Sequence, residues 1–475
     1  MEMSHEDKFD RDGIRNDGVP YYEADAQRLQ SYADASETLS RFQVPVLVHA
    51  GSPHERLYVA AFDGTGNDVY KDPQHATNVA KVYNQISDGN NRWVATGYVP
   101  GPGTEDNYIA RTLDSMNGHT YDARIEEMYK KFIDRAWQWK QDDPDAQIRV
   151  ADIGFSRGAE QAAGFARVVQ ERGIQDPSGA IYIYDRHHQI THVEYTKPPL
   201  VAPGQVAQAV GLFDPVGTGE PVRNHDRRLP PSVISGFQII AADERRGLFK
   251  SDHIIDPGMT PDGRFLGVAV AGAHSDVGGS YHRDGLAIRS DNLMADYLNT
   301  LSDQPFLKRQ PEPVDPRLDV VHRSEDGMLL FELGHKIDRL GPGGYNELLV
   351  PKGEAKHVSD PFNAEPRNES LNRQFERQNV RSGTQAVVPD QPTNAPGNDL
   401  SARLDRLLMA GQASDWSTFS RENQALAFGD AGHSMLTNAA AYADRLEQHA
   451  TQQMTQQQSM PPPTQQTVQG PVMHH

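Results

Sequence analysis

Between residues 56 and 301, short apolar runs alternate with longer stretches in which apolar residues recur at helical spacing. A short run rich in β-branched residues indicates a buried strand, and apolar positions three or four apart indicate a helix with one buried face. Strands that alternate with helices predict an α/β fold, with a mostly parallel sheet and helices on both faces. The expected strands are Leu57–Phe62, Ile148–Phe155, Val206–Phe213, Gly236–Ala242 and Phe265–Ala271, and the expected helices are Thr77–Ser87, Thr120–Lys140, Arg157–Arg172 and Leu286–Leu301.

The pattern changes outside this region. Polar residues dominate before residue 55, with one helical segment around Ala24–Leu39, and beyond residue 303 the periodicity gives way to many Pro, Asn and Gly residues. Leucines at helical spacing return at residue 400, and the end of the chain is rich in Gln. We therefore expect a polar leader (1–54), an α/β domain (55–303), an irregular extension or linker (304–399), a small helical module (400–450) and a disordered tail (451–475).

Composition and charge narrow the classes of function. The 475 residues include no Cys, which excludes disulfides, thiol chemistry and Cys-ligated metals. The formal net charge of -19 argues against a nucleic-acid partner, which requires a basic face. No apolar run approaches the roughly 18 residues of a spanning helix, and the charged stretch 1–17 lacks the apolar core of a secretory signal. We therefore expect a cytoplasmic location in the cell that makes the protein.

The sequence Gly-Phe-Ser-Arg-Gly at residues 154–158 is the most informative motif. It lies between an expected strand, Ile148–Phe155, and an expected helix, Arg157–Arg172. In that setting Gly-x-Ser-x-Gly forms a nucleophile elbow, a tight turn that exposes the serine hydroxyl above the sheet edge. The positive end of the helix dipole favours the negative charge that develops during acyl transfer. Ser156 is therefore the candidate nucleophile.

A serine nucleophile requires a base and an acid, which in α/β hydrolases lie at strand ends and follow the serine in the order acid, histidine. His274 follows the expected strand Phe265–Ala271 and is the candidate base. Two residues are candidates for the acid. Asp214 ends the first expected strand after the nucleophile and Asp243 ends the second, and strand order alone gives Asp243 a slight advantage.

A glycine-containing loop, Asp63–Asp68, follows the apolar strand Leu57–Phe62. Backbone N–H groups at Gly64 and Thr65, together with that of Arg157, form the expected oxyanion hole. The two carboxylates of this loop could hold a divalent cation, but capping of the turn by the Asp side chains is the simpler interpretation. We expect neither a metal nor an organic cofactor.

Five motifs in one order resemble a known family. They are Phe-Asp-Gly-Thr-Gly-Asn (62–67), Gly-Phe-Ser-Arg-Gly-Ala (154–159), Gly-Leu-Phe-Asp-Pro-Val-Gly (211–217), Asp-Glu-Arg-Arg-Gly-Leu-Phe (243–249) and His-Ser-Asp-Val-Gly-Gly (274–279). Over roughly residues 56–301 the chain is similar to the α/β-hydrolase domain of bacterial type VI secretion lipase effectors. The resemblance implies a phospholipase A-type acyl-ester hydrolase with Ser156 as nucleophile and His274 as base. It also favours Asp214 as the acid, because this position carries the family's Gly-x-x-Asp signature, and it makes Asp243 part of the scaffold.

The resemblance also implies partners and a place of action. The expected substrate is membrane glycerophospholipid in a rival cell, and a contact-dependent secretion system would deliver the protein to the periplasm or membrane of that cell. An immunity protein would protect the producer, and a secretion-machinery adaptor is a further expected partner. The Gln-rich tail is similar to the tails of effectors exported by type IV machinery, so the export route is open between type VI and type IV.

Two other functions are open on the sequence alone. An esterase or thioesterase acting on small soluble acyl substrates would use the same three residues, Ser156, Asp214 and His274. A hydrolase fold could instead serve as a non-catalytic binding platform, although the nucleophile, acid and base are all present in order. The hairpin expected at 180–196 and the loop at 101–118 are the candidate walls or lid of a lipid cleft.

Overall fold

The computed structural model describes residues 9–89, 91–101, 118–186, 189–217, 227–326, 334–341, 343–346 and 364–383. The chain divides into two compact units, Met1–Val387 and Val388–His475, and all of the described residues belong to the first. The expected helical module at 400–450 and the tail at 451–475 lie outside the described residues, as does most of the loop at 101–118.

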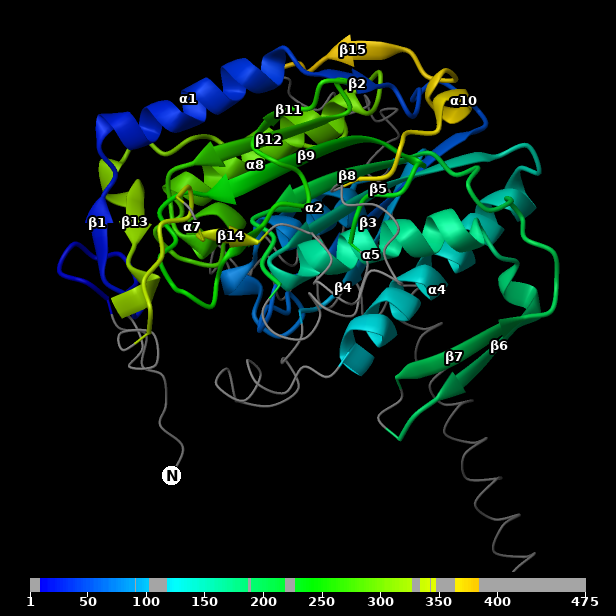
Figure 1. Cartoon of the computed structure of the whole chain (residues 1–475), viewed down its shortest axis with the longest axis horizontal. Coiled ribbons are helices and arrows are strands. Elements are labelled where there is room, and N and C mark those ends of the chain that lie inside the picture. Colours follow the sequence, from blue (N-terminus) through cyan, green and yellow to red (C-terminus); the bar gives the residue numbers. More distant parts are fainter. Residues whose placement is uncertain are drawn as a thin grey trace, which may run out of the picture. The chain divides into compact units, whose positions relative to one another are not determined.

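A mostly parallel sheet forms the centre of the first unit (Figure 1). Within the described residues it has seven strands in the order β11-β12-β9-β8-β5-β3-β4, and every neighbouring pair is parallel except β11 with β12. The strands are β3 (Glu55–Phe62), β4 (Val94–Val99), β5 (Gln147–Phe155), β8 (Gln208–Phe213), β9 (Val233–Ala241), β11 (Gly258–Met259) and β12 (Phe265–Val270). Because the parallel strands share one direction, their carboxyl ends meet at one edge, where the connecting loops can build a site.

Helices cover both faces of this sheet. Helices α1, α2 and α8 pack on one face and α4 and α5 on the other, so that each layer encloses its own apolar core (Figure 1). Their bounds are α1 (Ala26–Ser40), α2 (Asn78–Asp88), α4 (Gly118–Asp142), α5 (Arg157–Arg172) and α8 (Gly285–Thr300). The strands and helices expected from the apolar pattern coincide with these elements to within a few residues, and the predicted α/β fold is confirmed.

The pattern did not predict two strands of the sheet, the two-residue antiparallel strand β11 and the longer parallel strand β4. Gly97 interrupts its apolar run, which weakens the strand signal. The structure explains the glycine: a Cβ at this position would lie 2.1 Å from the hydroxyl oxygen of Tyr58 on β3. Gly97 therefore makes room for a buried tyrosine of the neighbouring strand.

The described part of the segment expected as a polar leader (1–54), residues 9–54, packs against the α/β domain. Strand β1 (Tyr21–Glu23) pairs antiparallel with β13 (Val320–His322), and β2 (Gln43–Pro45) pairs antiparallel with β15 (Arg377–Asn379). Phe42, Val44 and Leu47 are buried in the same apolar core as the residues of the sheet. In the described part of the chain, segments before residue 55 and after residue 303 thus complete the α/β domain.

Several short elements complete the described part of the fold. The expected hairpin is formed by β6 (Ala180–Tyr184) and β7 (Ile190–Tyr195). The remaining elements are β10 (Ser251–Asp252), which pairs in parallel with β14 (Tyr345–Asn346), α7 (His274–Gly278), α10 (Glu369–Asn372), η1 (Pro73–His75), η2 (Pro177–Gly179), η3 (Pro316–Leu318) and η4 (Ser324–Asp326). Among the described residues, no helix combines the length and the apolar character that a membrane crossing requires.

Candidate active site

Ser156 lies in the turn between β5 and α5, at the carboxyl edge of the sheet. Its backbone angles, φ 59° and ψ -126°, are rare for an L-residue and typical of a nucleophile elbow. The residues on either side of the turn must be glycines, because a side chain at either position would collide with neighbouring backbone. A Cβ on Gly154 would lie 2.3 Å from the carbonyl oxygen of Gly158, and a Cβ on Gly158 would lie 2.2 Å from that of Phe62. The strand–turn–helix setting expected around Ser156 is therefore present.

The structure brings His274 and Asp214 together at the same edge. Asp214 directly follows β8, the neighbour of β5, and His274 begins α7 after β12. The Nδ1 atom of His274 lies 2.6 Å from Oδ2 of Asp214, and both side chains are buried. A carboxylate that accepts a hydrogen bond from Nδ1 leaves Nε2 of a neutral imidazole as the proton acceptor, which is the arrangement that a general base requires.

Arg339, which sequence reasoning did not find, binds the carboxylate of Asp214. Its guanidinium donates to Oδ1 at 2.6 Å and to Oδ2 at 2.9 Å, and its Nε donates to the carbonyl oxygen of Phe249 at 2.7 Å. Burial by itself raises the pKa of Asp214, but the charge of Arg339 and the hydrogen bond with His274 outweigh burial and lower this pKa below its usual range. Asp214 is therefore ionised at neutral pH.

Two aromatic rings and a second carboxylate, that of Glu244, lie next to His274. The ring centroids of Phe155 and Phe249 lie 4.6 Å and 5.2 Å from that of the imidazole, and the backbone N–H of His274 donates to Oε2 of Glu244 at 3.2 Å. Burial lowers the pKa of His274 and outweighs the opposite effect of Asp214. The imidazole is therefore neutral at pH 7 and able to accept a proton.

Asp243, the alternative acid, takes part in a different network. Its Oδ2 accepts from the backbone N–H of Gly272 at 2.9 Å, and its Oδ1 lies 3.5 Å from both the guanidinium of Arg28 and the hydroxyl of Tyr22. These contacts join the loop after β9 to the N-terminal segment. Among the described residues, the carboxylate hydrogen-bonded to the imidazole of His274 is that of Asp214, not Asp243.

The loop expected to form part of the oxyanion hole is built differently at Gly64. The N–H of Gly64 donates to Oδ1 of Asp63 at 2.7 Å, so the expectation that Gly64 supplies an oxyanion donor is corrected by this contact. Asp63 also accepts from the hydroxyls of Tyr98 and Thr77, and burial raises its pKa to about 6. Asp63 thus fixes the loop by capping it, which leaves Thr65 and the first turn of α5 as candidate oxyanion donors.

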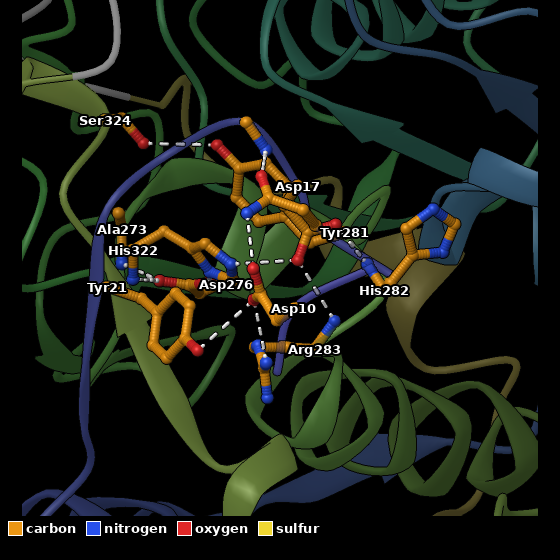
Figure 2. Close-up of polar contacts among 12 residues, drawn as sticks. Asp10, Asp17, Tyr21, Ala273, Asp276, Tyr281, His282, Arg283, His322 and Ser324 are labelled. Atoms are coloured by element: carbon orange, nitrogen blue, oxygen red, sulfur yellow. Dashed lines mark hydrogen bonds and ion pairs between the residues drawn. The ribbon is translucent and has the colours of Figure 1, made fainter. Parts of the chain in front are cut away.

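A buried network behind α7 fixes the backbone that carries His274 (Figure 2). Asp276 accepts from the backbone N–H groups of Ala273 and His322 at 2.8 and 2.9 Å, and its Oδ1 lies 2.5 Å from Nδ1 of His322. The Nε2 of His322 lies 3.2 Å from Oδ2 of Asp17, in the N-terminal segment. Burial disfavours the charged imidazole, but the two carboxylates outweigh burial and raise the pKa of His322 to about 9, so this residue is a cation at neutral pH.

One group of side chains in the described part of the chain has the spacing of a metal site. It consists of His54, Asp143 and Asp145, with Nδ1 of His54 2.9 Å from a carboxylate oxygen of Asp143. The group lies beside the amino ends of β3 and β5, at the opposite edge of the sheet from Ser156. It therefore has no part in the candidate active site.

The mostly parallel sheet, its two helical layers and the elbow at Ser156 define an α/β-hydrolase-like protein. The model of one protein family, described as the catalytic domain of the Tle1-like phospholipase effectors of the type VI secretion system, matches residues 56–306, about half of the chain. The chain belongs to this Tle1-like family, and the resemblance inferred from the five sequence motifs is confirmed.

The chain is similar to the Tle1 effector in its complex with the VgrG spike of the type VI secretion system, with 20% identity and a TM-score of 0.32 over 48% of this chain and 52% of that chain. It therefore spans about half the length of that effector. An uncharacterized protein from Pseudomonas aeruginosa matches with 15% identity and a TM-score of 0.33 over 86% of this chain and 66% of the other. No curated protein sequence matches the chain.

Proposed function

We propose that this chain is a serine-dependent phospholipase that hydrolyses acyl esters of glycerophospholipids. The observation that supports this proposal most is the buried hydrogen bond between His274 and Asp214, at the same sheet edge as the elbow of Ser156. A paired acid and base beside an elbow serine are the components of acyl-transfer catalysis. Membership of the Tle1-like family supports phospholipid as the substrate class.

The proposed reaction uses three side chains, two backbone N–H groups and a water molecule. The Oγ of Ser156 attacks the ester carbonyl while Nε2 of His274 takes its proton, and Asp214 stabilises the imidazolium that forms. Backbone N–H groups of Arg157 and Thr65 stabilise the oxyanion. His274 then gives its proton to the departing lysophospholipid, and the same residue activates the water that releases the fatty acid from the acyl-enzyme.

We further propose that the protein acts as a secreted antibacterial effector in the periplasm or at the membrane of a target cell. Family membership supports export by a type VI system, and a secretion-machinery adaptor would then be one partner. A phospholipase that is made in the cytoplasm endangers the membrane of its producer, so an immunity protein is a second proposed partner.

Fatty-acid release from mixed phospholipid vesicles tests the enzymatic proposal. We expect Asp214→Asn to reduce the rate by about 10⁴-fold and Ser156→Ala by about 10⁶-fold, because each removes one member of a unit that acts together. Asp243→Asn is the matched control, since it changes a carboxylate at the neighbouring strand end that contacts Gly272 and not the imidazole of His274. Its activity should stay within about threefold of wild type, as expected for a residue outside the reacting unit.

Other outcomes would favour the remaining functions. Hydrolysis of a short-chain soluble ester without release from vesicles would indicate an esterase or thioesterase. Inactivity on both substrates, with a biological effect that survives Ser156→Ala, would indicate a binding platform. Loss of activity in a folded Asp243→Asn variant, with activity kept in Asp214→Asn, would make Asp243 the acid.

A further inference from the structure

Arg339 faces the candidate acid from outside the part of the chain that matches the family. We infer that Arg339 is a positioning residue of the catalytic centre, which orients Asp214 and sets the proton affinity of the Asp214–His274 pair. The inference rests on the proposed function, because it takes Asp214 as the acid. The guanidinium is fully buried and donates to both oxygens of the buried carboxylate, at 2.6 and 2.9 Å. Such a bidentate contact fixes the orientation of the carboxylate and also stabilises its negative charge.

The backbone around Arg339 is anchored to the loop after β9. The N–H of Ile337 donates to the carbonyl oxygen of Arg245 at 2.9 Å, and Nε of Arg339 donates to that of Phe249 at 2.7 Å. Strand β14, a few residues further on, pairs in parallel with β10. Contacts on both sides of Arg339 therefore hold its guanidinium in place beside the active edge.

The four contacts of the Asp214 carboxylate leave it little freedom to rotate. Oδ1 accepts from Arg339 and from the backbone N–H of Ala241, at 2.9 Å, and Oδ2 accepts from Arg339 and lies 2.6 Å from Nδ1 of His274. Without the guanidinium, one backbone N–H and the imidazole would be left to hold the carboxylate. Arg339 therefore directs one oxygen toward the base.

Arg339 also acts through its charge. Among the described charged side chains, Arg339 faces Asp214, whereas Glu244 and Arg246 lie on the side of His274 and pair with each other at 2.8 Å. A cation beside Asp214 stabilises the carboxylate and opposes formation of the imidazolium, so it lowers the proton affinity of the pair. Removing that cation should raise the pH at which His274 loses its proton.

The test is the variant Arg339→Gln in the full-length protein. We expect the acid limb of the kcat/KM profile, measured by ester hydrolysis, to move upward by about one pH unit or more, because the imidazolium of His274 loses a neighbouring like charge. The imidazole titration of His274, followed by NMR with ¹³C-labelled histidine and assigned with His274→Gln, should move in the same direction. This second measurement requires no activity.

Two further variants separate charge from orientation. Arg339→Lys keeps the positive charge but cannot make the bidentate contact with Asp214. We therefore expect kcat to fall about fivefold or more at unchanged KM, while the acid limb stays within about 0.3 pH unit of its wild-type position. Arg317→Gln is the surface control: Arg317 pairs with Asp315 at 2.6 Å, and its side chain is 52% exposed. Its activity and pH profile should match those of wild type.

A folded Arg339→Gln variant with the acid limb and the His274 titration at their wild-type positions would overturn the inference, whatever its rate. If Arg339→Gln does not fold, a folded Arg339→Lys variant with wild-type kcat would overturn it instead. Different results would contradict the proposed function itself: wild type would not hydrolyse the ester, or Ser156→Ala would retain hydrolysis. The NMR titration would then still decide whether Arg339 sets the proton affinity of His274.

Discussion

Backbone strain at the scale of single residues is concentrated in the candidate site. In the described part of the chain, φ is positive at three non-glycine residues, namely Ser156 (59°), Asp214 (40°) and Ser280 (98°). The first two are the candidate nucleophile and acid, and each directly follows a strand of the central sheet. Such conformations cost about 1–3 kcal/mol each and persist only where the surrounding structure imposes them. The positions of these two side chains are thus set by the packed ends of β5 and β8.

The strain at Ser156 predicts an order of stability between two inactive variants. Both Ser156→Gly and Ser156→Ala remove the hydroxyl and should abolish hydrolysis. Glycine adopts a positive φ freely, whereas alanine retains the strain, so the glycine variant should have the higher free energy of unfolding by about 1 kcal/mol in denaturant titrations. At Ser36, within helix α1, the order should reverse, because glycine is the poorer helix former. A less stable glycine variant at position 156 would contradict the strain argument.

Ionic contacts between elements support the active edge. Helix α7 has five residues, too few to be stable alone, and the network of Asp17, His322 and Asp276 joins it to β13 and to the N-terminal segment. The contact between Arg339 and Asp214 joins the segment at 334–341 to the end of β8 in the same way. The short elements of the site are therefore fixed from outside the central sheet.

The sequence predicted those features whose cause is local. Strand β5, helix α5 and the elbow of Ser156 follow from apolar periodicity and two nearby glycines. Arg339 stands 125 residues from Asp214, in a region without periodicity, so no sequence pattern could indicate their contact. The oxyanion assignment of Gly64 failed for a related reason, because a sequence cannot show that a neighbouring side chain takes up a backbone N–H.

The network behind α7 predicts that stability depends on pH. The pKa of His322 is raised from 6.5 to about 9, so its contribution is fully present below about pH 6.5 and is lost as the pH rises through about 9. We expect the free energy of unfolding of wild type to fall by about 2 to 3 kcal/mol across this window because of His322. The measurement is a series of denaturant titrations between pH 6 and 10.

The variant His322→Leu should lose most of this pH dependence, whereas His192→Gln, a change at an exposed histidine of the hairpin, should keep it. Equal slopes for wild type and His322→Leu would mean that the buried imidazole does not carry its charge in the folded protein.

Across the whole of the first unit, segments beyond the family match complete the apolar core. The match spans residues 56–306, whereas the core on the side of α1, α2 and α8 also includes Phe42, Leu371 and Val380. The pairing of β2 with β15 brings these residues together from segments more than 300 positions apart. The apolar core of the α/β domain expected at 55–303 therefore includes residues from segments before and after those bounds.

This dependence predicts the effect of a substitution in the segment before residue 55. Phe42 is fully buried, its ring stacks on that of Tyr297 with centroids 6.1 Å apart, and its carbonyl oxygen accepts from the N–H of Val380 at 3.0 Å. Phe42→Ala should lower the free energy of unfolding by about 3–5 kcal/mol, the usual cost of such a cavity. Phe9→Ala, at a side chain that is 60% exposed, should change it by less than about 0.5 kcal/mol. Denaturant titrations followed by tryptophan fluorescence measure both, and an unchanged stability for Phe42→Ala would make the N-terminal segment an appendage of the catalytic domain.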